Sequence, residues 1–446
     1  MTPSTGLLAL DRAHLLHPQH EGTACDAAHV WVKGDGVFLT DTDGRRYLDG
    51  MAGLWNVTAG HGRTELADAA CDQMIELAFA SAYAGSSHPR AIELAERLAA
   101  VMYPSINRFF FTSGGAESNE TAIKIARSYW KRRDRPAKTK VISLTLGYHG
   151  VTLAAMSASG LDAYWPAFEP RVPGFVHVPS PYPYRYTAPA GVSPGVAAAN
   201  ELEDAILREG ADTVAMFLAE PVQGVGGVIV PPPDYFPRVR QICDQYDVLF
   251  AADEVITGFG RTGKLCALDH WGVQPDLVQF AKAVTSGYFP FGGVGVNDTI
   301  AAALDEGYSP WMHAFTYSAH PVGCAVALRM LDIIEREAFP ARAASLGDHL
   351  LGQLRARLGD HPHVGDIRGK GLMCAIELVQ DRRTKAEFPG AEQVGARVNA
   401  EAMKRGLFTR RRADIIMLAP PIVISLEEVD QIAETMAASI AGVLGN

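Results

Sequence analysis

The sequence predicts an α/β protein, with a large domain built on a mostly parallel central sheet flanked by helices and a smaller α+β domain. Two short apolar runs, VLFAA and DLVQFA, have the length and composition of buried strands in a parallel sheet. Other strand-like runs alternate with segments of helical periodicity, which is the pattern of βαβ units. From about residue 335 helices and short strands follow in a different order, which indicates a separate α+β domain.

The domain boundaries follow from these changes of pattern. Residues 1–60 alternate short apolar runs with Gly and Asp turns, as a small antiparallel sheet does, and are expected to belong to the small domain. Residues 61–334 are expected to form the large domain, and residues 335–446 to complete the small one. A chain of 446 residues is long enough for more than one domain.

The composition excludes several classes of function. Hydrophobic residues make up 48 % of the chain and charged residues 20 %, as is usual for a soluble globular protein. The net charge of −10 leaves no basic footprint, so no nucleic acid partner is expected. No apolar run approaches the roughly 20 residues that a bilayer span needs, so no membrane partner is expected.

The N-terminal residues and the cysteines indicate a cytoplasmic protein. Residues 1–18 carry acidic and His side chains where a secretory signal needs a basic start and an apolar block. The cysteines lack CxxC spacing, which argues against a disulfide framework and a zinc site, and no metal is expected. They are Cys25, Cys71, Cys243, Cys266, Cys324 and Cys374.

The first strand of the large domain leads into a turn that suits a phosphate. Residues 108–111 form an apolar run, TSGG follows, and a helix is expected to open at Ala116. This order directs backbone N–H groups and the positive end of a helix at one spot, with Ser113, Gly114 and Gly115 as candidate phosphate ligands. The turn has neither GxxxxGK[ST] nor GxGxxG, and such a turn can also serve only to reverse the chain.

The next strands place further polar and aromatic groups. VISLTLGYHG reads as a strand that ends at Tyr148, an aromatic able to stack on a flat cofactor. Residues 165–194 are rich in Pro and aromatics and are expected to form a long ordered loop. TVAMFLA is followed by Glu220 and Gln223; the Glu220-Pro221 pair could equally only fix a turn.

The two apolar runs named first each deliver a charged residue at the carboxyl end, Asp253 and Lys282. In open α/β sheets ligands bind beyond the carboxyl ends of the strands. A lysine and a carboxylate there suit pyridoxal phosphate, since the lysine forms the Schiff base and the acid keeps the pyridine nitrogen protonated. Taken alone, the pair could also be a helix-capping Asp and a solvated Lys.

With their spacings, these motifs resemble the class III pyridoxal-phosphate aminotransferases of fold type I. The resemblance covers nearly the whole chain, from GLWNVTAGHG through TSGGAESNE, YHG, AEPVQG, DEVITGFGRTG, FAKAVTSGYFP and FTYSAHP to LAPP. DEVITGFGRTG followed by Lys282 is highly specific to that family. Trp55, the PSPYPYR loop and GGVIVPP are most similar to the ω-amino acid:pyruvate group, which includes amine, taurine and diamine transaminases.

The resemblance implies pyridoxal phosphate as cofactor and a ping-pong transfer of an amino group from an ω-amino acid or primary amine to pyruvate, by way of a Schiff base on Lys282. It implies a homodimer or a tetramer with shared active sites, in which Thr316 reaches the phosphate bound by the partner. The cofactor contacts that it implies are Ser113, Gly114, Gly115, Tyr148, Glu220, Gln223, Asp253, Val255, Lys282 and Thr316.

The substrate residues that the resemblance implies are Trp55, Tyr83, Tyr148, Val225, Phe315 and Arg410. Arg410 matches the arginine that binds the substrate carboxylate in a bidentate fork, although Arg411 and Arg412 adjoin it and leave the register open. Val225 stands where family members that use 2-oxoglutarate often carry Glu. Trp55 could equally be a core residue at a domain join.

Other functions stay open at this stage. An aminomutase, an epimerase or a decarboxylase would keep the same fold and cofactor. A nucleotide-binding oxidoreductase is disfavoured, because GxGxxG is missing while Asp253 and Lys282 are present. The sequence does not distinguish β-alanine, arylalkylamines, taurine and diamines as amino donors.

Overall fold

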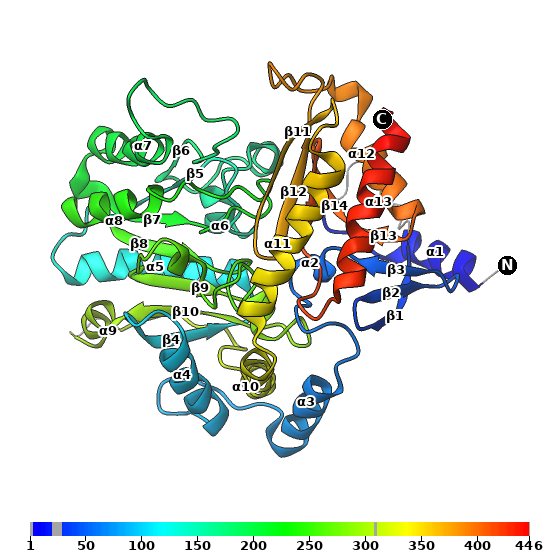
Figure 1. Cartoon of the computed structure of the whole chain (residues 1–446). Helices are drawn as coiled ribbons and strands as arrows, with labels where there is room; N and C mark the ends of the chain where they lie inside the picture. The colour runs from blue at the N-terminus through cyan, green and yellow to red at the C-terminus, as the bar shows by residue number, and fades with distance from the viewer. Residues whose placement is uncertain (1–2, 20–28, 307–309, 446) are drawn as a thin grey trace.

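A computed structural model describes residues 3–19, 29–306 and 310–445, and it divides into a large and a small lobe (Figure 1). The large lobe is built on a seven-stranded sheet in which only the strand β10 runs antiparallel to its neighbours, so the mostly parallel sheet is confirmed. In spatial order its strands are β4 (Ile106–Thr112), β10 (Gly292–Asn297), β9 (Leu277–Phe280), β8 (Leu249–Asp253), β7 (Val214–Ala219), β5 (Lys140–Leu144) and β6 (Phe175–Val178).

Helices cover both faces of this sheet. Every residue of β7, β8 and β9 is buried, which explains why these strands are almost continuously apolar instead of alternating. One face packs against α5 (Gly115–Arg132), α6 (Leu153–Ala158) and α9 (Asp298–Asp305). The other face packs against α4 (Pro89–Val101), α7 (Pro194–Glu209), α8 (Tyr235–Gln245) and α10 (Pro321–Arg336).

The small lobe contains two four-stranded sheets. The first comprises β1 (Trp31–Asp35), β2 (Phe38–Asp41), β3 (Arg46–Asp49) and β13 (Leu407–Phe408), and the second β11 (Val364–Lys370), β12 (Met373–Leu378), β15 (Ile415–Leu418) and β14 (Arg410–Arg412). Because β13 pairs with β3, the first strands of the chain lie beside its C-terminal part. This pairing agrees with a small domain assembled from both ends of the chain, although its exact boundaries stay a prediction.

Helices complete the small lobe. They are α11 (Phe339–Leu358), α12 (Val394–Lys404) and α13 (Leu426–Leu444), which begins with a capping box between Ser425 and Glu428. The N-terminal elements are α1 (Pro3–His14), α2 (Ala52–Trp55) and α3 (Thr64–Leu77), and short 3₁₀ turns cover residues 162–164, 166–168, 211–213, 267–270, 282–284 and 390–392. In the described ranges no helix is long and apolar enough to cross a membrane.

Two local expectations are wrong. The strand expected to end at Tyr148 ends at Leu144, because Leu146 adopts a positive φ of 63° and its N–H bonds to Gly160 O, which turns the chain. The segment 165–194 is not loop throughout, since it contains β6. This strand pairs only with β5 at the edge of the sheet, a position that tolerates nearby prolines.

Two glycines of α11 provide a matched test of the packing between this helix and the second small sheet. A Cβ on Gly347 would overlap the backbone of Gly371, whereas nothing lies within 4 Å of a Cβ on the exposed Gly352. We expect Gly347→Ala to destabilise the protein by about 1–3 kcal/mol through overpacking. Gly352→Ala should stabilise it by up to about 1 kcal/mol, because alanine favours the helix.

The apparent melting temperature of each variant, measured by scanning calorimetry, checks this expectation. Melting temperatures that shift in the same direction in both variants would contradict it.

Candidate active site

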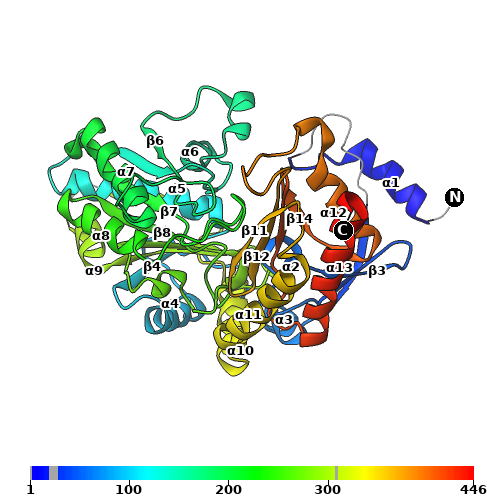
Figure 2. The ribbon, with the colours of Figure 1, turned by 45° about the horizontal axis from the view of Figure 1, so that its top comes forward.

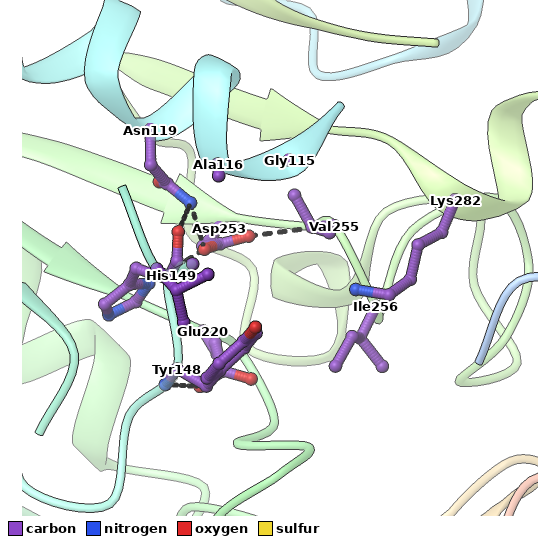
Figure 3. Close-up of a pocket in the computed structure, with 12 residues that line it drawn as sticks. Gly115, Ala116, Asn119, Tyr148, His149, Glu220, Asp253, Val255, Ile256 and Lys282 are labelled. Atoms are coloured by element: carbon purple, nitrogen blue, oxygen red, sulfur yellow. Dashed lines mark hydrogen bonds and ion pairs between the residues drawn. The ribbon is translucent and has the colours of Figure 1, made fainter. Parts of the chain in front are cut away.

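A pocket of about 140 Å³ lies beyond the carboxyl ends of the central strands (Figure 3). The residues expected from the sequence that line it are Gly115, Tyr148, Glu220, Asp253, Val255 and Lys282. They come from α5 and from the segments that follow β5, β7, β8 and β9. Parallel strands end at the same edge of a sheet, and this is why residues so distant in the chain meet at one spot.

Asp253 ends β8 and is buried, with 2 % of its surface exposed. One carboxylate oxygen, Oδ1, accepts a hydrogen bond from the Val255 N–H at 3.1 Å. The other, Oδ2, accepts from Asn119 Nδ2 and from His149 Nδ1, each at 2.8 Å. These donors hold the negative charge and the direction of the carboxylate. Asp253 does not cap a helix, because the chain continues from β8 into turns.

His149 is fully buried beside Asp253. To donate to the carboxylate its Nδ1 must carry a proton, and we assign that tautomer from the hydrogen bond. Its Nε2 finds no hydrogen-bond partner within the described residues. The ring therefore has one strong polar contact, to Asp253, which makes orienting this carboxylate its evident task.

Lys282 follows β9 and extends its amine into the pocket (Figure 3). Its backbone has a positive φ of 47°, a conformation that costs a non-glycine residue roughly 1–3 kcal/mol. Burial lowers the pKa of the ammonium, while Asp253 and Glu220 oppose this effect. Across the three described ranges, no hydrogen bond reaches the amine. A lysine with a lowered pKa is a better nucleophile, and this amine is free to react.

Glu220 lies at the end of β7 and is almost fully buried. Burial raises the pKa of its carboxyl to about 7, with His149 lowering it and Asp253 raising it further. Its Oε1 accepts from the Tyr148 N–H and its Oε2 from the Gly224 N–H, both at 2.9 Å. Glu220 therefore connects the loop after β5 to the loop after β7, which goes beyond fixing the Glu220-Pro221 turn.

The turn before α5 offers space for an anion. A Cβ on Gly114 would meet no atom within 4 Å, so the approach to this backbone is open. A Cβ on Gly115 would lie 2.9 Å from Val255 Cγ1, so glycine is needed there for packing. The first N–H groups of a helix have no partner inside the helix, and they are available to a phosphate. The Ser113 N–H is an exception, because it donates to Glu117 Oε2 at 2.8 Å.

These groups fit pyridoxal phosphate. One pocket is lined by the free amine of Lys282, the buried carboxylate of Asp253 and the open start of α5. These groups match, in that order, the aldehyde, the ring nitrogen and the phosphate of the cofactor. The ring of Tyr148 also borders the pocket, where burial raises the pKa of its hydroxyl.

The arginine run lies on β14, and none of its three arginines is among the residues that line the pocket. The ring of Tyr148 is 6.2 Å from that of Tyr164, and the charges of Arg410 and Arg412 reach Tyr164 and lower its pKa against the larger, raising effect of burial. Arg411 lies on the opposite face of the strand, as alternation requires, and donates to Ala413 O. The structure thus separates Arg411 from its two neighbours.

Several expected residues lie outside the pocket lining, and their roles stay predictions. Gln223 is buried, with Ser180 Oγ donating to its Oε1 and its Nε2 donating to Thr145 O. Trp55 is buried in an apolar cluster with Ile256, and Val225 packs against this cluster. The remaining residues outside the lining are Tyr83, Thr316 and Arg410, all exposed, half-buried Phe315, and Ser113 and Gly114 beside it.

Sequence reasoning missed two residues, Asn119 and His149. Both hydrogen-bond to Asp253, yet they come from α5 and from the loop after β5. The only local signal was the position of His149 next to Tyr148, at the end of an apolar run. A contact between three distant segments leaves no periodic trace in a single sequence.

Known proteins are similar to this chain over most of its length. Residues 23–440 match the family described as Aminotransferase class-III. The chain is 41 % identical to the putrescine–pyruvate aminotransferase of Pseudomonas aeruginosa, over 95 % of this chain and 93 % of that protein. It is 40 % identical to the diaminobutyrate–2-oxoglutarate transaminase of Halomonas elongata, over 97 % and 95 %.

Solved structures of transaminases are also similar to this chain. A thermostable (S)-enantioselective omega-transaminase from Thermomicrobium roseum is similar, with a TM-score of 0.95, 48 % identity and 99 % of both chains covered. An amine transaminase from an uncultivated Pseudomonas species, solved with pyridoxal phosphate bound, has a TM-score of 0.93 and 40 % identity, with 96 % of this chain and 99 % of that one covered.

The first prediction from this geometry concerns Lys282. Borohydride reduction of the protein loaded with pyridoxal phosphate should place the label on Lys282, because its free amine faces the pocket. Peptide mapping by mass spectrometry reads out the position of the label. Lys282→Ala should lose turnover while the protein stays folded, and a label on another lysine would refute the assignment.

The second prediction concerns the carboxylate. Asp253→Asn should keep the cofactor bound but slow the half-reaction with amine at least roughly a hundredfold, because the charge next to the ring nitrogen is lost. His149→Gln retains a hydrogen-bond donor and should slow it by about tenfold or less. Single-turnover absorbance measurements compare the two variants. A wild-type rate in Asp253→Asn would show that this carboxylate has only a structural role.

Proposed function

Since the chain belongs to the class III aminotransferases, which depend on pyridoxal phosphate, we propose that it moves an amino group from a primary amine or ω-amino acid to pyruvate, by a ping-pong mechanism. The observation that carries this proposal is the convergence of Lys282, Asp253 and the start of α5 on one pocket. The putrescine–pyruvate aminotransferase supports pyruvate as acceptor. No relative named above is an aminomutase, an epimerase or a decarboxylase, so these alternatives are not favoured.

The bound cofactor supplies the electron sink for carbanion chemistry. Lys282 contributes an amine whose pKa is lowered by burial, so that its Nζ can take a proton from a substrate carbon and return it nearby. Asp253 would hold a proton on the ring nitrogen of the cofactor, and Asn119 and His149 keep its carboxylate in place. The start of α5 would bind the phosphate.

Two walls of the pocket restrict the amine. Tyr148 lies on one side, and Val255 and Ile256 supply apolar surface on another. The part of the donor that contacts Val255 and Ile256 should be uncharged, because a charge buried against this apolar surface would have to be desolvated. Relatives named for putrescine and diaminobutyrate add diamines to the donors that a first panel should include.

We also propose a homodimer that works in the cytoplasm. Exposed apolar side chains gather on α3 and the loops near it, including Ile75 at 80 % and Tyr83 at 51 % exposure, and Phe79 contacts Tyr317 with ring centroids 6.2 Å apart. Monomers rarely expose such patches, and a twofold axis would cover this one. Thr316 is exposed beside Tyr317, and in this proposal it would contact the phosphate bound by the partner. The cysteines in the described ranges are all free, as a reducing compartment requires.

The choice of acceptor tests the substrate assignment. Val225 is apolar and cannot pair with an arginine, so we propose that Arg410 turns towards solvent when no carboxylate is bound. Breaking an exposed ion pair costs only about 0–1 kcal/mol, so such movement is feasible. We expect pyruvate to be preferred over 2-oxoglutarate by at least roughly tenfold in kcat/KM, or about 1.4 kcal/mol, because the second charge of 2-oxoglutarate would meet apolar walls. Steady-state kinetics with both acceptors checks this, and equal values would refute it.

Arginine variants test the carboxylate contact directly. Arg410→Ala should impair pyruvate much more than an aldehyde acceptor that lacks the carboxylate. Arg411→Ala is the matched control, because its side chain lies on the other face of β14. Equal losses with pyruvate and aldehyde would show that Arg410 is structural. A selective loss of pyruvate use in Arg412→Ala would instead assign the carboxylate contact to Arg412, on the same face of β14.

A further inference from the structure

A buried guanidinium reaches from the small lobe to the segment that follows Glu220. Arg368 lies on β11 and is only 8 % exposed. Its Nε donates to Gly227 O at 2.9 Å and to Val228 O at 3.1 Å, and its Nη2 donates to Gly227 O at 2.6 Å. Figures 1 and 2 show β11 on the side of the small lobe that faces the large sheet.

Carboxylates compensate the charge of this arginine from the other side. Its Nη1 donates to Asp366 Oδ2 at 2.9 Å and to Glu377 Oε2 at 2.7 Å. Glu377 is also buried, and it accepts hydrogen bonds from Arg185 and from Tyr182. A planar guanidinium can satisfy carbonyls and carboxylates at the same time, whereas an ammonium cannot reproduce this fork. The guanidinium of Arg368 is therefore held by backbone carbonyls on one side and by carboxylates on the other.

The carbonyls that Arg368 binds belong to a hairpin tip at residues 224–228. Gln223 and Ile229 close the hairpin through paired backbone hydrogen bonds of 3.1 and 3.0 Å. At the start of the tip, the Gly224 N–H donates to Glu220, which borders the pocket. A Cβ on Gly224 would lie 2.7 Å from Ile256 Cδ1, so the tip packs directly against a pocket wall.

We infer that Arg368 is a positioning residue for amino transfer, because it holds the hairpin tip that orients Glu220 and presents Val225 next to the pocket. The inference rests on the proposed function. Through Arg368 the small lobe would influence the reaction, although Arg368 itself does not line the pocket. Within the described residues Arg368 is the side chain that donates to the carbonyls of Gly227 and Val228.

The tests use a matched pair of arginines. Arg368→Lys keeps the positive charge near Glu377 but cannot form the fork to both carbonyls. Arg185→Met removes the other cation on Glu377 and leaves the hairpin tip untouched, because Arg185 contacts Glu377, Glu387 and Lys385 O. Gly227→Ala loosens the tip itself, because Gly227 has a positive φ of 119° and a Cβ there would lie 3.0 Å from Ile415 Cδ1 and 3.1 Å from Arg368 Nη2.

The first readout needs no activity. In the cofactor-free protein, hydrogen–deuterium exchange of peptides covering residues 221–230 should rise clearly in Arg368→Lys and in Gly227→Ala, and stay at the wild-type level in Arg185→Met. Unchanged exchange in both tip variants would overturn the inference, as would an equal rise in Arg185→Met. Using two tip variants keeps the test valid if one of them fails to fold.

The second readout is catalytic. We expect kcat/KM for pyruvate to fall at least tenfold in Arg368→Lys and less than twofold in Arg185→Met, measured with saturating cofactor. Faster exchange without a change in kinetics would overturn the functional part of the inference. Wild-type protein that bound the cofactor but transferred no amino group would instead refute the proposed function, while the exchange result would still stand.

The pH profile separates positioning from general destabilisation. The hydrogen bond from the Gly224 N–H lowers the pKa of Glu220, so losing it should raise that pKa above about 7. His149, Asp253, Lys282 and the Tyr148 N–H, which face Glu220, are unchanged in the variants. The acidic limb of log kcat/KM should therefore move to higher pH in Arg368→Lys and in Gly227→Ala, and stay in place in Arg185→Met. An acidic limb that stays in place would contradict the link through Glu220.

Discussion

The buried carboxylate of Asp253 is the constraint on which the rest of the pocket depends. An ionised group out of contact with water is costly unless hydrogen bonds compensate it. The compensation comes from Asn119 on α5, His149 after β5 and the Val255 N–H after β8. Each donor must be in place for the charge to be stable, so three chain segments are fixed around one oxygen pair. The same arrangement leaves the carboxylate directed at the pocket.

Glu220 and Lys282 show how burial prepares a site for proton transfer. Burial disfavours the charged form of each group, raising the pKa of the acid and lowering that of the amine. Both changes bring the pKa closer to neutrality, where a side chain can give or take a proton readily. Their mutual attraction, with that of Asp253, limits the effect on the lysine. Burial of these two side chains thus tunes their proton affinity for the reaction.

The residues that line the pocket belong to the large lobe, and the small lobe packs behind one of its walls, at Ile256. An apolar cluster that includes Trp55, Ile256 and Met417 joins segments of both lobes behind the pocket. Arg368 adds a polar contact at the edge of this junction, where its charge is compensated by buried Glu377. Apolar packing resists separation of the lobes but is not directional, whereas the guanidinium fork fixes one backbone position. Together the two interactions hold the small lobe against the segments that follow β7 and β8.

The sequence by itself determined the α/β class, the parallel strands and the identity of Asp253 and Lys282 at their ends, because strand burial and chain order are written in local periodicity. The family was equally readable, since it depends on contiguous motifs. Only the tertiary structure decided which residues touch. It paired His149 and Asn119 with Asp253, buried Gln223 away from the pocket and placed Arg411 on the far face of β14. Such contacts arise between segments far apart in the chain, and their geometry depends on how whole elements pack, which no local pattern records.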